Sequence, residues 1–123
     1  MKHDDPADLL PLPHLNYFVL LALADGDAHG WAVIKRIREM SVGRANPSSG
    51  SLYLAMVRME DAGLIAEAKA PADADARRRY YRLTPFGRRV LAAESVRLAE
   101  LVARAGRLKL LDQAGSARPG KGS

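Results

Sequence analysis

Ser48-Ser49-Gly50-Ser51-Leu52-Tyr53 is the stretch that decides the fold of this 123-residue chain. Ser48 is a natural N-cap, because its hydroxyl oxygen can accept a backbone N–H from the first turn of a helix. Gly63 lies where a helix that ends in a left-handed residue needs glycine, and Leu64 can then fold back onto the last turn. We therefore predict a helix that begins after Ser48 and ends at Gly63.

A strand-loop-strand pattern follows this helix directly. The first predicted strand covers Leu64–Ala68, the loop covers Lys69–Ala76, and the second strand covers Arg77–Leu83. Side chains alternate between the two faces of a strand, so the first and third of the three leading arginines are expected to share one face and the second to lie on the other. Asp73 and Asp75 in the loop would repel phosphates, so we expect the strand rather than the loop tip to bind a polyanion.

Two further helices are predicted before this stretch. Residues 14–24 are so densely apolar that they suit a central helix covered by its neighbours. A second helix is predicted from His29 to Ser41, with Arg36 on its solvent side and apolar residues returning at three-residue steps. These apolar residues are Trp31, Ile34, Ile37 and Met40. Trp31 is interpreted as core or dimer-interface packing, with ligand stacking as the alternative.

Thr84-Pro85 predicts the start of the last helix, with an N-cap followed by a proline at the first helical position, where its missing N–H costs nothing. This helix is predicted to run to Leu111, which makes it roughly 40 Å long. The unit before it is already closed, so we expect its narrow apolar stripe to pack against a second copy of the chain. The predicted dimerisation residues on this stripe are Leu91, Leu98, Leu101, Val102 and Leu108.

Together these elements predict a mainly α fold with a small β-hairpin, namely a winged helix-turn-helix with a long C-terminal dimerisation helix. The predicted organisation is a flexible N-terminal arm at 1–13, a winged-helix unit at 14–84, the dimerisation helix at 85–111 and a disordered tail at 112–123. Prolines in the arm, and glycines and serines in the tail, are the reason for expecting no regular structure there.

Charge and composition limit the classes of partner and of chemical site that this chain can have. The net charge of +5 and a pI near 9.9 indicate a polyanionic partner. Arginines gather between Arg77 and Lys109, where only two glutamates occur, and this clustering favours nucleic acid over solubility alone. The chain has no cysteine, which excludes disulfides, thiolate metal sites and a cysteine nucleophile. No signal peptide or bilayer-spanning stretch is evident, so we expect a cytoplasmic, nucleoid-associated protein with no membrane partner.

The residues predicted to contact DNA lie at the starts of the second and third helices and on the second strand. Serine hydroxyls and a helix N-terminus both attract phosphate, and arginines suit the DNA backbone or minor groove. The predicted DNA-binding residues are His29, Ser48, Ser49, Gly50, Ser51, Tyr53, Arg58, Arg77, Arg78 and Arg79.

Several of these positions have an alternative that the sequence leaves open. Gly50 either is tolerated at a helix start or allows a close approach to phosphate or a base edge. His29 is either only a cap or also a phosphate contact, and Tyr53 is either a buried ring with a surface hydroxyl or a phosphate contact. Leu54 and Val57 are either ordinary exposed apolar residues or contacts to thymine methyls in the major groove.

The chain resembles the PadR-like transcriptional regulators, a bacterial family of winged-helix proteins. The matching residues are His29-Gly30-Trp31, Ser48 to Tyr53, Arg58-Met59-Glu60, Gly63-Leu64-Ile65, Arg79 to Thr84, and Gly87. The resemblance covers Leu15 to Leu111, and its pieces are specific in this order and spacing. The family often has proline at the positions of Ser49 and Leu54, so base contacts near Leu54 are expected to differ from those of relatives.

The resemblance implies a homodimer joined through the first and last helices, repression of a nearby promoter, and release by a small-molecule effector in some members. The last helix here contains no tryptophan. This absence argues against the flat aromatic drug site between subunits that some relatives have.

We therefore expect a sequence-specific, DNA-binding transcriptional regulator, a homodimeric repressor bound to an imperfect palindromic operator in double-stranded DNA. Each third helix would enter a major groove, with half-sites about one helical turn apart. No cofactor and no metal are expected. The alternative is a winged-helix protein-interaction module without DNA binding. An enzyme is a distant third, because His3, His14 and His29 are scattered and no acid–base pair or phosphate loop is visible.

Overall fold

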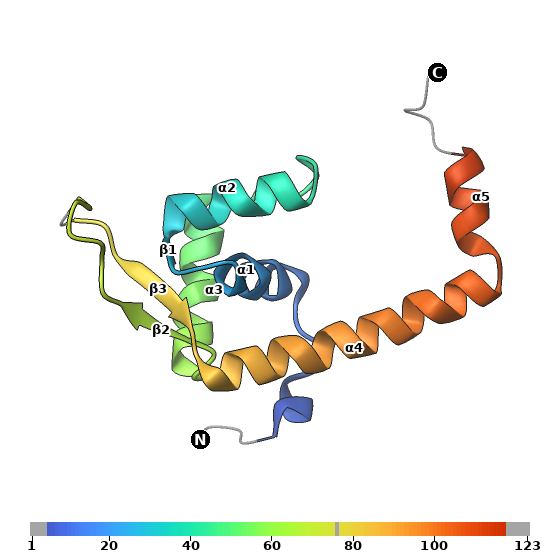
Figure 1. The fold of residues 1–123 in the computed structure, drawn as a ribbon, viewed down its shortest axis with the longest axis horizontal. Helices are drawn as coiled ribbons and strands as arrows, with labels where there is room; N and C mark the ends of the chain where they lie inside the picture. The colour runs from blue at the N-terminus through green and yellow to red at the C-terminus, as the bar shows by residue number, and fades with distance from the viewer. Residues whose placement is uncertain (1–4, 76, 118–123) are drawn as a thin grey trace.

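The structure is a computed structural model that describes residues 5–75 and 77–117, and Figure 1 shows its course. Helices dominate, and a small sheet lies at one end. The elements are η1 (Pro6–Leu9), α1 (His14–Ala24), β1 (Ala28–His29), α2 (Gly30–Met40), α3 (Ser49–Asp61), β2 (Ile65–Ala68), β3 (Tyr80–Leu83), α4 (Pro85–Arg107) and α5 (Leu110–Ala117).

Helix α1 lies at the centre of the fold and contacts α2, α3, α4 and β3 (Figure 1). Its buried residues are Val19, Leu20, Ala22 and Leu23. These side chains meet the buried faces of α2 and α3, and the N-terminal half of α4 closes the cluster with Val90 and Leu91. The predicted central helix is therefore confirmed with its predicted bounds.

Helix α3 has the two ends that its sequence predicts. The Ser48 hydroxyl oxygen accepts the backbone N–H of Ser51 at 3.1 Å, so Ser48 is the N-cap. Gly63 has a φ of 81°, and the N–H of Leu64 donates to the Met59 carbonyl at 2.9 Å. The Leu64 side chain is buried. This C-terminal arrangement satisfies carbonyl oxygens that the helix would otherwise leave unpaired.

The sheet has the order β1-β3-β2, with both pairs antiparallel. Strands β2 and β3 form the predicted hairpin, which projects beyond α2 and α3 as a wing (Figure 1). Strand β1 has only two residues, Ala28 and His29, and pairs with Tyr81 and Tyr80. It was not predicted, because two residues carry no periodicity. The α2–α3 pair followed by this hairpin confirms the winged helix.

The second strand is shorter than predicted. It begins at Tyr80, whose partner Ala68 is the last residue of β2, so the preceding arginines have no strand to pair with. Instead the chain turns around Asp75, whose carboxylate accepts the N–H of Arg77 at 2.9 Å and whose carbonyl accepts the N–H of Arg78 at 3.0 Å. The prediction that the three arginines alternate on a strand is therefore wrong.

The N-terminal segment differs from the loose arm that we expected. Pro6–Leu9 forms the 3₁₀ helix η1, which lies against α4, and Leu9, Leu10 and Leu12 pack on the core. Their apolar side chains outweigh the neighbouring prolines, because burial against α4 stabilises an otherwise irregular backbone. Residues 1–4 of the expected arm lie outside the described residues.

Glu94 fixes this segment to α4. Its side chain is 1% exposed and accepts the N–H of Leu12 at 2.9 Å. It also accepts two hydrogen bonds from Arg97, at 2.6 Å from Nε and 3.0 Å from Nη2. A buried carboxylate is stable only when it is paired and hydrogen-bonded in this way. The pairing lowers the pKa of Glu94, chiefly through the Arg97 hydrogen bond and further through the Leu12 N–H, while burial acts in the opposite direction.

Replacing Glu94 with alanine is expected to lower the free energy of unfolding by about 2 kcal/mol, because the Leu12 N–H loses its acceptor. Since the folded-state pKa is lowered, the stabilisation is present above the ordinary glutamate pKa and is lost as pH falls through the lowered value. Denaturant unfolding at neutral pH and in acid measures both effects. Glu100→Ala, an exposed change on the same helix, is the control and should shift stability by less than about 0.5 kcal/mol. Equal losses in the two variants would contradict this role.

The C-terminal region is two helices where one was predicted. Helix α4 ends at Arg107, Lys109 has a φ of 62°, and α5 then runs over Leu110–Ala117. Residues 112–117 are therefore helical and not part of a disordered tail. The remainder of the predicted tail, residues 118–123, lies outside the described residues.

Candidate nucleic-acid interface

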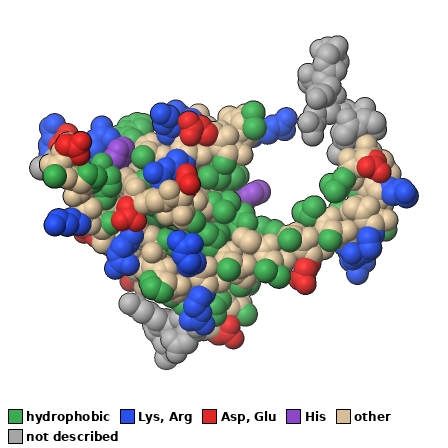
Figure 2. All heavy atoms as spheres, in the orientation of Figure 1, with side chains coloured by type: hydrophobic (Ala, Val, Ile, Leu, Met, Phe, Trp, Pro, Cys, Tyr) green, Lys and Arg blue, Asp and Glu red, His purple; other side chains and the backbone are tan. Residues whose placement is uncertain are grey.

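A groove of about 410 Å³ is lined by basic, polar and apolar residues from three parts of the chain. Its walls come from the start of α2, the first two turns of α3 and the segment that leads into β3. Six of the ten residues predicted to contact DNA line it, namely His29, Ser49, Tyr53, Arg77, Arg78 and Arg79. Figure 2 shows Lys and Arg side chains gathered around the wing, at the left of the molecule, with acidic side chains among them.

The start of α3 is open to a ligand. Ser48, Ser49 and Ser51 are exposed, and a Cβ built at Gly50 would meet nothing within 4 Å. Ser48 satisfies the N–H of Ser51, while the first N–H groups of the helix keep their partial positive charge. A helix start of this kind is suited to an anion. Arg58 lies further along α3, where it lines a separate shallow hollow with Val57, Glu60 and Asp61.

His29 caps α2 and also contacts the segment that leads into β3 and carries Arg77, Arg78 and Arg79, which we call the wing segment. Its Nδ1 accepts the N–H of Ala32 at 3.2 Å, and Nη1 of Arg78 lies 2.9 Å from its Nε2. A neutral imidazole that accepts at Nδ1 carries its hydrogen on Nε2. The same Nη1 lies 3.3 Å from Nδ1, so the Arg78 guanidinium can donate to whichever ring nitrogen carries the lone pair. Burial lowers the pKa of His29, and the charges of Arg78 and Arg36 lower it further.

The three arginines before β3 differ in what they contact. Arg77 pairs with Asp75 at 3.3 Å, and Arg79 pairs with Glu67 at 3.1 Å. Within residues 5–75 and 77–117, no ion pair involves Arg78. Its charge is therefore the least compensated of the three. Surface pairs of the other two arginines are weak and exchange readily for another anion.

Two aromatic side chains are more exposed than expected. Trp31 is 62% exposed, so of the two packing roles predicted for it the core is wrong, while the dimer interface stays a prediction. The buried face of α2 is made by Val33, Ile34 and Ile37, and Trp31 extends past it into the groove. Tyr53 is 59% exposed, which excludes the alternative of a buried ring. Both rings are therefore open to a ligand in the groove.

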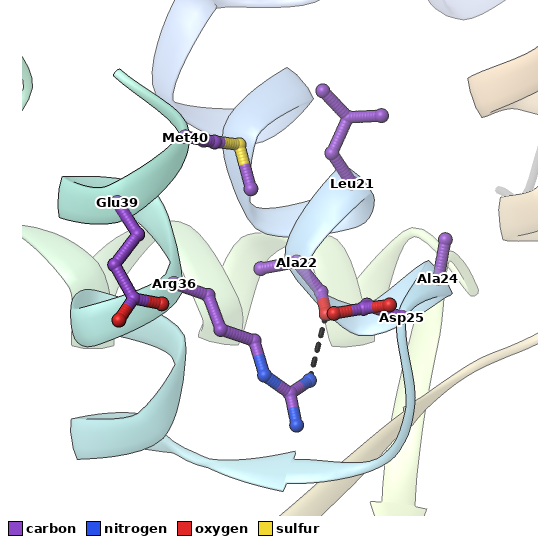
Figure 3. A pocket seen from close by; sticks show the side chains of 7 residues that line it. All are labelled: Leu21, Ala22, Ala24, Asp25, Arg36, Glu39 and Met40. Carbon is purple, nitrogen blue, oxygen red and sulfur yellow. Dashed lines mark hydrogen bonds between the residues drawn. The ribbon is translucent and has the colours of Figure 1, made fainter. Parts of the chain in front are cut away.

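A second hollow, of about 630 Å³, lies between the C-terminal halves of α1 and α2 (Figure 3). Arg36 points from α2 toward the end of α1, where its Nη1 donates to the carbonyl oxygens of Ala22 at 2.8 Å and Gly26 at 2.7 Å. We had expected Arg36 on the solvent side. Instead it is half-buried and holds the turn between α1 and β1, so this arginine is a structural residue.

The predicted dimerisation residues divide into two groups. Leu91 is 7% exposed and belongs to the core of its own chain, so it is not free to pack against a partner. Leu98 is half-buried, whereas Leu101, Val102 and Leu108 are each more than half exposed. The stripe was read from helical periodicity alone, which does not tell where α4 leaves the core.

In residues 5–75 and 77–117, every helix is too short or too polar to cross a lipid bilayer. The same residues bring together no group of three histidine, aspartate or glutamate side chains that could hold a metal ion.

Comparison with known proteins gives the family. An uncharacterised 37.1 kDa protein of a Streptomyces fradiae transposon is 41% identical over 86 residues, which are 70% of this chain but only 23% of that protein. A PadR family transcription regulator from Clostridium difficile has a TM-score of 0.65 at 24% identity, covering 78% of this chain and 98% of that one. Bacillus subtilis PadR, solved in complex with operator DNA, has a TM-score of 0.57 at 20% identity, covering 66% of this chain and 46% of that one.

The family model of the transcriptional regulator PadR-like family matches residues 19–93, which is more than half of the chain. The match runs from the middle of α1 into α4 and therefore includes α2, α3 and the β2–β3 hairpin. The chain belongs to the PadR-like family of transcriptional regulators.

Proposed function

We propose that this chain is a homodimeric repressor that binds an imperfect palindromic operator in double-stranded DNA near the promoter it controls. The observation that carries the proposal is the groove in which the start of α3 and the arginines before β3 lie on one face. A helix start and a flanking basic segment can contact the two sugar-phosphate backbones that border a major groove. The resemblance extends the proposal to release by a small-molecule effector, as in some members of the family.

In this proposal His29 and Arg78 share one DNA phosphate. The Arg78 guanidinium contacts the His29 ring through Nη1 and has no carboxylate partner among the described residues, so its remaining N–H groups can donate to a phosphate oxygen beside the ring. The nearby serine hydroxyls of Ser49 and Ser51 would hold a second phosphate or a base edge. These contacts fix the position of α3 in the groove but do not read sequence.

The second copy of the chain would pack on the C-terminal helices. From Ala99 to Gln113 every described side chain except Ala105 is exposed, and apolar ones recur among them. Leu101, Val102, Leu108 and Leu111 are each more than half exposed. Figure 2 shows hydrophobic side chains on the side of α4 that borders the open space below α1 and α2. A contiguous apolar surface of this kind marks an interaction site.

Replacing Arg78 with alanine is expected to weaken binding to every DNA sequence, because a phosphate contact is lost. The slope of log affinity against log salt should fall by about 0.9 for each phosphate contact removed. The measurement is a salt titration of binding to the DNA upstream of the chain's own gene, by gel shift or fluorescence anisotropy. Arg107→Ala removes the same charge at the far end of α4 and should leave the slope unchanged.

Two results would count against the proposal in different ways. An unchanged slope for Arg78→Ala would remove Arg78 from the set of phosphate contacts while leaving DNA binding intact. Failure of the wild-type chain to shift its own upstream DNA, in preference to unrelated DNA, would favour the alternative of a protein-interaction module.

A further inference from the structure

The outer face of α3 is apolar in its middle and exposed to solvent. Tyr53, Leu54 and Val57 are 59%, 56% and 44% exposed, and Gly50 begins the same stripe one turn earlier. Positions spaced by three, four and seven residues lie on one side of a helix, so these four share a face. The opposite side of α3 packs in the core, which means that this face is what the helix presents outward.

The surroundings of this face indicate a nucleic-acid partner and not a second copy of the chain. At its N-terminal end are the exposed serines of the helix start, and beside it lies the groove with Arg77, Arg78 and Arg79. An apolar stripe between basic and hydroxyl groups complements a DNA groove. The groove is bordered by anionic sugar-phosphate backbones, and its floor is formed by base edges. The exposed apolar surface of α4 is separate from it and lies on another helix.

The side chains of the stripe limit how it can read bases. Among Gly50, Tyr53, Leu54 and Val57 only the Tyr53 hydroxyl offers a hydrogen bond, and no amide or guanidinium projects from these four positions. The pairs of hydrogen bonds by which Asn, Gln or Arg recognise adenine or guanine are therefore not available there. The single apolar group that a base pair shows in the major groove is the C5-methyl of thymine.

We propose that Leu54 and Val57 are specificity-determining residues that contact thymine C5-methyl groups in each operator half-site. The inference rests on the proposed function, because it requires that α3 enters a major groove. It assigns thymine at the positions opposite the centre of α3, and it leaves the phosphate contacts to the helix start and the wing segment.

Deoxyuridine tests this inference, because it differs from thymidine only in lacking the methyl group. Each thymine of the bound operator is replaced in turn, in both half-sites together, and affinity is measured by anisotropy. Loss of one buried methyl should lower affinity about fourfold per half-site, or about fifteenfold for a symmetric pair. Leu54→Ala or Val57→Ala should remove the preference for thymine over deoxyuridine at its own position and keep the salt slope of the wild-type chain.

The control is Val96→Ala, an equally exposed apolar change on α4, which should retain the full thymine preference. If deoxyuridine is accepted at every position while the operator is still preferred over scrambled DNA, the inference is overturned and the proposed function stands. If Leu54→Ala and Val57→Ala both keep the thymine preference, these residues do not read the methyls. If the wild-type chain forms no specific complex at all, both proposals fail together.

Discussion

Replacing Gly87 with alanine is expected to lower the free energy of unfolding by about 3 kcal/mol, at the upper end of what overpacking usually costs. Gly87 is buried in the first turn of α4, where a Cβ would overlap the carbonyl oxygen of Leu64 and lie 2.9 Å from its carbonyl carbon. That carbonyl cannot move away cheaply, because it accepts the backbone N–H of Thr84 at 3.1 Å. The Thr84 hydroxyl donates to Gly63 at 2.6 Å and accepts the N–H of Gly87, which ties the same junction together.

Gly50→Ala is the matched control for this experiment. Gly50 also lies near the start of a helix, but an added Cβ there meets nothing within 4 Å. Alanine should therefore stabilise the chain by up to about 1 kcal/mol through its better helix propensity. Chemical denaturation followed by circular dichroism compares the two variants with the wild-type chain. An unfolding midpoint for Gly87→Ala equal to that of the wild type would show that the first turn of α4 and the Leu64 carbonyl are not in the close contact described here.

The parts of the fold that could be predicted from sequence are those set by neighbouring residues. The caps at Ser48 and Thr84 and the left-handed Gly63 act within one turn of a helix, so their residue types are sufficient signals. The apolar density of 14–24 likewise predicts a central helix. These features give the order of the helices and the place of the hairpin without any knowledge of long-range contacts.

Features that depend on distant partners were missed or misplaced. The second strand was extended to Arg77, because its true start is set by the end of β2 and not by its own residues. The N-terminal leucines were overlooked, since their partner Glu94 lies 82 residues away. Leu91 was placed with the dimerisation residues because periodicity continues along α4 after the core ends.

In the candidate site, too, features set by neighbouring residues could be predicted and features set by distant partners could not. The serines at the start of α3 and the arginines before β3 were identified as candidates from residue type and order. That Arg77 and Arg79 have carboxylate partners while Arg78 faces His29 could not be read from the sequence, because it depends on how the wing segment folds against α2. The sequence also left open whether Trp31 lies in the core, since its spacing matches that of the buried residues of α2.

Leu101→Asp is expected to convert the proposed homodimer into monomers and to weaken operator binding at least about 100-fold. Leu101 is 53% exposed on the part of α4 that projects beyond the core, so the change should leave the fold of the single chain intact. In a dimer interface the aspartate would be buried without a partner, which costs several kcal/mol. A monomer then binds one half-site at a time and loses the avidity of two linked sites, which is worth roughly 100- to 10,000-fold.

Ala103→Asp adds the same charge two residues further on, where the side chain is exposed on the opposite side of the helix, and it should remain a dimer with normal operator affinity. Light scattering on the eluted protein gives the oligomeric state, and circular dichroism shows whether each variant is folded. A folded Leu101→Asp variant that still scatters as a dimer would place the interface elsewhere on the chain. A folded monomer that binds the operator as tightly as the wild type would instead show that pairing of two copies is not what gives this chain its affinity for DNA.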